Sequence, residues 1–122
     1  MATLLDISPA EVNVEVTRRD STPFSFTLQD ADGEPINITG YTSFTLTVDP
    51  VEAPGDATAN LFSITAAFPS PASGVITFSP SIANNNQPPN EYFFDVEQID
   101  DSSNVRTIMK GKYTILADIT QT

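Results

Sequence analysis

The chain has 122 residues, which is enough for one hydrophobic core and too few for two. It contains no Cys, His or Trp, which excludes disulfides, Cys/His zinc sites and the Ser-His-Asp and Cys-His catalytic arrangements. Sixteen acidic and five basic residues give a net charge of −11. Because nucleic acids and anionic membranes are bound through Lys and Arg, neither is expected as a partner.

Residues 1–10, MATLLDISPA, precede the first strand pattern and carry Leu4, Leu5 and Ile7. The segment lacks the basic residues and the long apolar run of a signal peptide, and synthesis in the cytoplasm is expected. Two interpretations stay open. The segment is an edge strand or strap on the domain, or it is an arm that docks its apolar side chains on a neighbouring protein.

Three stretches between residues 11 and 48 alternate apolar and polar residues, as half-buried strands do. The first covers residues 11–17, with valines on one face, and the second covers residues 24–28. The third covers residues 43–48, and we expect Phe26 and Phe44 to be core positions. Residues 30–35, DADGEP, predict a turn centred on Asp-Gly.

The second half of the chain predicts further short strands between loops rich in Pro, Gly and Asn. A glycine at position 111 predicts a bulge in the last strand or between the last two. The predicted strands cover residues 61–64, 75–78, 92–97, 105–110 and 112–119, and the loops and turns cover residues 49–60, 68–74, 82–90 and 100–104, with one helical turn near 79–84.

About seven or eight short strands at this spacing predict a single all-β domain over residues 11–122, built as an antiparallel β-sandwich. The Cys…Trp…Cys spacing of an antibody domain is absent. No pattern indicates a second domain.

The order of the segments resembles the N-terminal immunoglobulin-like domain of baseplate upper proteins of tailed bacteriophages. The resemblance is carried by VEVTRRDSTPFSFTLQD, ADGEPINITGY and SFTLTVDP, and further on by SGVITFSP, EYFFDVEQID and VRTIMKGKYTILADIT. It covers roughly residues 11–120. It implies an immunoglobulin-like β-sandwich that builds a virion. The family often has Gly before Asp20, where this chain has Arg19, and its multi-domain members continue into segments that engage receptor-binding proteins.

Two acidic clusters are candidate sites. Asp30, Asp32 and Glu34 could hold Ca²⁺, but the full calcium-loop spacing is missing and a plain turn is the simpler interpretation. Asp95 and Glu97, with the acids of the 100–104 turn, could act as an acid–base pair on a sugar. Their alternation places them on a solvated strand face, so we expect neither a metal, a cofactor nor a catalytic role.

The candidate interface residues are the bases and one loop aromatic. Arg18 and Arg19 form one basic pair, and Lys110 and Lys112 form another. Each pair could bind an acidic neighbour, balance local acids or guard a strand edge. Phe68 lies beside two prolines, and it either packs under its loop or inserts into a neighbouring subunit.

We therefore expect a non-enzymatic virion protein, present in several copies, that packs against baseplate, tail-fibre or major capsid proteins. A baseplate or tail-tip adaptor follows from the resemblance. A capsid decoration protein is favoured by the acidity and by the single domain. A carbohydrate-binding β-sandwich is the third alternative, and the absence of Trp speaks against it.

Overall fold

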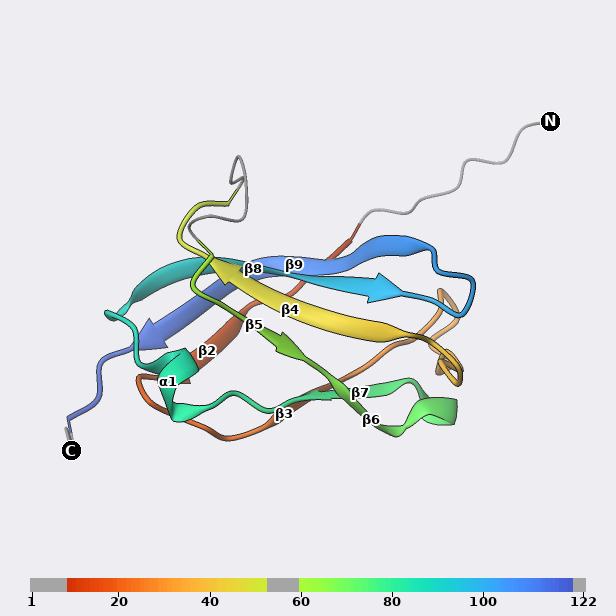
Figure 1. Ribbon diagram of the computed structural model, residues 1–122, viewed down its shortest axis with the longest axis horizontal. Coiled ribbons are helices and arrows are strands. Elements are labelled where there is room, and N and C mark those ends of the chain that lie inside the picture. The colour runs from red at the N-terminus through yellow and green to blue at the C-terminus, as the bar shows by residue number, and fades with distance from the viewer. Residues whose placement is uncertain (1–8, 53–59, 120–122) are drawn as a thin grey trace.

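The computed structural model describes residues 9–52 and 60–119 as two packed β-sheets, seen edge-on in Figure 1. The larger sheet has the order β1-β9-β8-β4-β5, with β2 also beside β9, and the smaller sheet has the order β3-β7-β6. The elements are β1 (Ala10–Glu11), β2 (Val14–Thr17), β3 (Phe24–Thr27), β4 (Ser43–Asp49), β5 (Phe62–Thr65), β6 (Ala67–Ser70), a 3-10 turn (Pro71–Ser73), β7 (Val75–Phe78), α1 (Ile82–Asn85), β8 (Asn90–Ile99) and β9 (Val105–Leu116).

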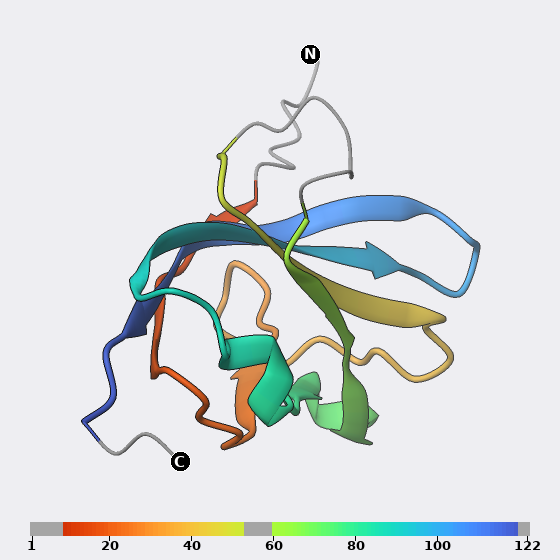
Figure 2. The same ribbon diagram turned by 60° about the vertical axis from the view of Figure 1, so that its left-hand side comes forward.

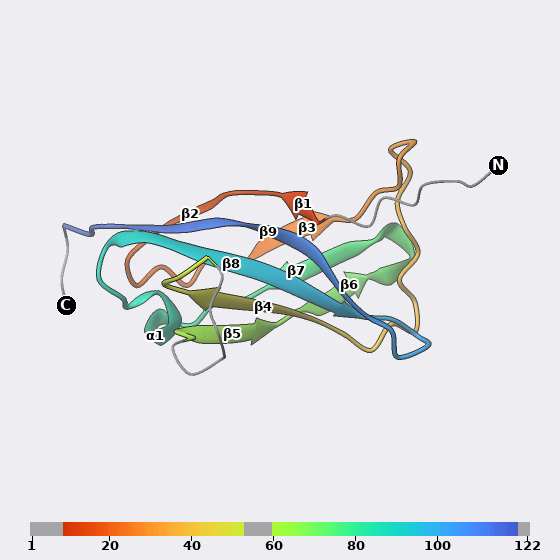
Figure 3. The same ribbon diagram turned by 90° about the horizontal axis from the view of Figure 1, so that it is seen from above.

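This arrangement confirms the predicted all-β sandwich, and its strand order is immunoglobulin-like. The sheet β9-β8-β4-β5 corresponds to the G-F-C-C′ strands of a variable-type domain, and β3-β7-β6 corresponds to B-E-D. Figure 3 shows the larger sheet from above, with β2 at one side and β5 at the other. The pairing departs from a purely antiparallel sandwich in one place, because β1 and β2 run parallel to β9.

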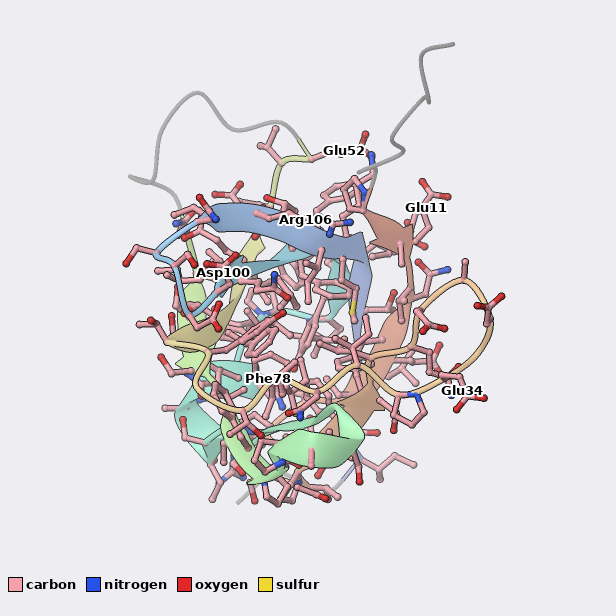
Figure 4. The ribbon with its side chains drawn as sticks, turned by 90° about the vertical axis from the view of Figure 1, so that its right-hand side faces the viewer. Glu11, Glu34, Glu52, Phe78, Asp100 and Arg106 are labelled. Atoms are coloured by element: carbon pink, nitrogen blue, oxygen red, sulfur yellow. The ribbon has the colours of Figure 1, made fainter. Side chains whose placement is uncertain are left out.

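The core lies between the sheets and follows the predicted alternation. Phe44, Leu46 and Val48 on β4 are fully buried, and Ser25 on β3 is exposed as expected. Figure 4 shows Phe78 in the interior, whereas Glu11 and Glu34 lie at the periphery. The buried cluster is Ile38, Phe44, Leu46, Val48, Ile64, Ile76, Phe78, Tyr92, Phe94, Val96, Met109, Tyr113 and Ile115.

A tyrosine corner closes one end of the sandwich. The hydroxyl of Tyr92, near the start of β8, donates to the backbone carbonyl of Pro88 four residues upstream. Immunoglobulin-like domains carry this contact at the start of the strand that corresponds to β8. Two residues further on, where antibody domains have their second cysteine, this chain has the buried Phe94. Its ring packs edge-on against Tyr113, with ring centroids 6.3 Å apart.

A buried polar network joins three parts of the chain at the same end. Figure 2 shows α1 at this end of the sandwich, next to the chain that leaves β2. Ser81 caps α1 by accepting the N–H of Asn84. The side chain of the fully buried Asn85 accepts the hydroxyl of Tyr113 at 2.7 Å and donates to the backbone carbonyl of Asp20. Burial raises the pKa of Tyr113 to about 12, so it remains a neutral donor at physiological pH.

Tyr113→Phe is expected to lower the free energy of unfolding by about 1–3 kcal/mol, because it leaves the buried side-chain oxygen of Asn85 without its donor. The measurement is urea unfolding of the variant and the parent chain. Tyr92→Phe is the matched control, since its lost acceptor, Pro88, is exposed and can be hydrated. Equal losses in the two variants would contradict a special role for the buried network.

The glycine of the last strand has a different role from the predicted bulge. β9 is continuous, and its register against β8 shifts between Val96, which faces Met109, and Glu97, which faces Thr107. The last strand therefore does contain an irregularity, but the extra residue is Ile108 and not Gly111. A Cβ on Gly111 would lie 1.6 Å from the carbonyl oxygen of Val12, in the segment that joins β1 to β2. Glycine is therefore required because the backbone between β1 and β2, which run alongside β9, approaches β9 closely at this point.

Candidate functional site

A groove on the outer face of the larger sheet is the most site-like feature of the described residues. It has a volume of about 760 Å³ and mixes apolar, acidic and basic side chains. The strand register places Thr47 and Lys110 on either side of Asp95, and Asp49 and Lys112 on either side of Phe93. Figure 4 shows Glu11 and Glu52, which also line the groove, on this outer side.

The charges in the groove are only partly paired. The ammonium of Lys112 lies 3.4 Å from the carboxylate of Glu91, and both side chains are more than half exposed. An ion pair of this kind contributes little to stability. Lys110 pairs in register with Glu11 and Asp95 but forms no ion pair within residues 9–52 and 60–119. Within that part of the chain the exposed ammonium of Lys110 has no acidic partner.

Asp49 is the one buried acid at the groove. One of its carboxylate oxygens accepts the N–H of Val51 at 2.8 Å. The other is buried and has no hydrogen-bond partner among the residues that the structure describes. In that same part of the chain, no group of three or more acidic side chains is placed to hold a metal ion.

The structure keeps the two predicted basic pairs apart. Arg18 donates to the side-chain oxygen of Asn86 at 3.1 Å and lies 4.0 Å from the carboxylate of Asp118, at the end of the sandwich that holds α1. Arg19 follows in a left-handed conformation, with φ of 69°, and donates its N–H to the carbonyl of Asn85. Lys110 and Lys112 lie instead on the outer sheet face.

The other candidate interface residues fall into two groups. Phe68, on β6, packs against the core and makes an edge-to-face contact with Phe44, with centroids 5.2 Å apart. Leu4, Leu5 and Ile7 lie outside the described residues.

Both predicted acidic turns are formed by backbone hydrogen bonds. The Asp30 carboxylate accepts the N–H groups of Asp32 and Glu34 at 2.9 and 3.0 Å, and Gly33 has a φ of 80°. The Asp100 carboxylate likewise accepts N–H groups of the β8–β9 hairpin. These carboxylates hold the turns together.

Asp95 and Asp100 are expected to affect stability in opposite directions. Partial desolvation and the neighbouring Glu97 raise the pKa of Asp95, so its ionisation disfavours folding above its ordinary pKa of 3.8. Backbone hydrogen bonds from Asn104 and Ser102 lower the pKa of Asp100. The ionised Asp100 carboxylate therefore stabilises the folded chain. This stabilisation is complete above the pKa that Asp100 has in the unfolded chain, and it is lost as the pH falls through the lower pKa of the folded chain.

Asp95→Asn should therefore raise the unfolding free energy at pH 7, by less than about 1 kcal/mol for an exposed charge. Asp100→Ala should lower it. The measurement is urea unfolding at pH 7 and at about pH 3, where the effect of Asp95→Asn should vanish. A stabilisation that persists unchanged in acid would contradict the electrostatic cause.

No family model matches the sequence, and no curated protein matches it either. Crystal structures give weak similarities. CopC from Methylosinus trichosporium OB3b is 9% identical over 90% of this chain and 89% of that chain, with a TM-score of 0.49. The 2,6-sialyltransferase of Vibrionaceae Photobacterium sp. JT-ISH-224, crystallised with CMP and lactose, is 14% identical with a TM-score of 0.32, over 90% of this chain and 18% of that one.

Neither similarity carries an argument about function. The class of protein is defined by the strand order and the tyrosine corner, and it is the immunoglobulin-like β-sandwich. No helix of the described residues is long and apolar enough to cross a membrane.

Sequence reasoning did not identify the groove. Its residues come from strands far apart in the chain, and they meet only through the sheet register. One signal was available: Phe93 lies between two inward aromatic residues, and strict alternation places its ring on the outer face.

Proposed function

We propose that the chain is a structural protein of a tailed-bacteriophage virion, a β-sandwich adaptor that packs against other virion proteins at the baseplate or tail tip. It is made in the host cytoplasm and has no catalytic activity. One observation carries the proposal: the series of segments that resembles the baseplate domain. Those segments supply β2, β3, β4 and the last three strands, in the order that an immunoglobulin-like sandwich requires.

The two turns of that series have structural roles that support their use as a signature. The Asp-Gly turn is closed by the carboxylate of Asp30. Tyr41, which ends the ITGY segment, stacks on Phe44 of β4 with ring centroids 6.0 Å apart. The segments are therefore linked to one another by turn geometry and core packing.

The first experiment is quantitative mass spectrometry of purified virions. We expect about three to twelve copies per particle, as the cyclic symmetry of a tail allows. Roughly hundreds of copies would assign the chain to the capsid as a decoration protein instead. Absence from the purified virions would contradict both assignments.

A second experiment deletes residues 1–9, which contain Leu4, Leu5 and Ile7. Pairing of the first strand with β9 includes Ala10, so the deletion leaves β1 and β2 intact. If these residues form a docking arm, the truncated chain keeps its melting temperature but fails to enter particles. Normal incorporation would remove the arm from the proposal, and a large loss of stability would make these residues part of the core.

Glycan binding is the second candidate function, favoured by the groove on the outer sheet face. The ring of Phe93 offers an apolar surface, and Thr47, Asp95 and Lys110 offer hydrogen-bonding groups around it. The test is a glycan array followed by NMR titration. Phe93→Ala should abolish any binding, and Val105→Ala, an exposed residue that does not line the groove, is the control.

A further inference from the structure

The strand β5 ends the larger sheet and presents an open backbone edge. Among residues 9–52 and 60–119 it pairs with β4 alone, with Thr65 opposite Thr45 and Phe62 opposite Val48. The N–H of Ala66 donates to the carbonyl of Phe44, which makes that pair a hydrogen-bonded one. Because such pairs alternate along an antiparallel ladder, Phe62 and Ile64 bond to β4. The N–H and C=O groups of Ser63 and Thr65 therefore face outward.

This edge lies in a long uncharged part of an acidic chain. No charged residue occurs between Asp56 and Glu91, although the chain as a whole carries a net charge of −11. The four residues of β5, FSIT, include neither a charge nor a proline. Natural sheets usually protect their edges with charged side chains, prolines or bulges, so an unprotected edge is a template for a further strand.

The other edges are less suited to pairing. β1 and β2 carry the exposed carboxylates of Glu11 and Glu15, and β6 has Pro69 and a register shift against β7. The edge of β3 is also uncharged, with Ser25 and Thr27 facing outward by the same alternation. It is preceded by Asp20, however, and followed by the acidic turn of residues 30–34. A second acidic copy would be repelled there.

We propose that β5 pairs antiparallel with β5 of a second copy of this chain, which joins the two larger sheets across a two-fold axis at Ile64. In that register Ser63 of each copy lies opposite Thr65 of the other. Each such pair exchanges two hydrogen bonds, from the N–H of Ser63 to the C=O of Thr65 and from the N–H of Thr65 to the C=O of Ser63. A second copy fits this edge because the two-fold register presents the same backbone groups from both chains. Two chains of −11 repel one another, and β5 adds no charged side chain of its own to that repulsion.

The test is analytical ultracentrifugation of the full purified chain over a range of concentrations, so it does not depend on the proposed virion role. A short edge buries little surface area, so we expect a weak dimer with a Kd on the order of 100 µM. Ser63→Pro removes an N–H that faces away from β4, and it should raise the Kd at least about tenfold. Thr65→Lys, which adds a guarding charge, should act alike and serves if the proline variant does not fold.

Ser25→Pro is the matched control. Ser25 faces outward on the uncharged edge of β3, and its hydroxyl contacts Thr77 at 2.7 Å as that of Ser63 contacts Thr47 at 3.0 Å. The control should leave the Kd unchanged. A chain that stays monomeric up to about 1 mM would overturn the proposal. So would a dimer that survives both β5 variants, or one that only Ser25→Pro disrupts.

Discussion

Replacing Gly111 by alanine is expected to destabilise the domain by about 3 kcal/mol or more. The new Cβ would lie 1.6 Å from the carbonyl oxygen of Val12, and backbone atoms cannot rotate away as a side chain can. The first strand must therefore move off β9. Two hydrogen bonds would be lost, from the N–H of Val12 to the carbonyl of Lys110 and from the N–H of Lys112 to the side chain of Asn13.

Gly33→Ala is the control for this prediction. Gly33 has a φ of 80° but nothing within 4 Å of its Cβ position, so alanine there adds backbone strain of about 1 kcal/mol without a collision. Urea unfolding measures both losses, and hydrogen exchange of the β9 amides reports whether the first strand has detached. A Gly111→Ala variant no less stable than Gly33→Ala would contradict the close approach.

Phe44→Ala is expected to cost about 3–5 kcal/mol, because the ring is fully buried between the sheets. It contacts both Tyr41 and Phe68, so the cavity would be bounded by side chains of separate elements that cannot all close in. Thermal or urea unfolding measures the loss. A cost below about 1 kcal/mol would show that the core collapses around the vacancy.

Phe26→Ala should cost less, about 2 kcal/mol. The sequence pattern gives Phe26 and Phe44 the same core assignment, but Phe26 is only half-buried, because β3 is an edge strand of the smaller sheet. Ser25→Ala, on the exposed face of the same strand, should change stability by less than about 0.5 kcal/mol. If Ser25→Ala cost as much as Phe26→Ala, the register of β3 would be off by one residue.

The local pattern of the sequence was enough to predict most of the strands, their inward faces and the two acidic turns, but residues 68–74, predicted as a loop, include most of β6. Alternation identified Phe44, Leu46 and Val48 as the buried face of β4, and the turns at residues 30–35 and 100–104 formed as expected. These features depend on neighbours within a few residues, through side-chain periodicity and the hydrogen bonds of Asp in tight turns. Composition alone removed disulfide and Cys/His chemistry from consideration.

The features that depend on long-range pairing were decided only by the tertiary structure. The parallel run of the first strand along β9 explains Gly111, which by pattern alone indicated a bulge. The outer groove and the open edge of β5 follow from which strands are neighbours and in what register. One-residue changes in register exchange the two faces of a strand, and neighbours in a sheet come from distant segments. The periodicity of a single strand contains no information about either.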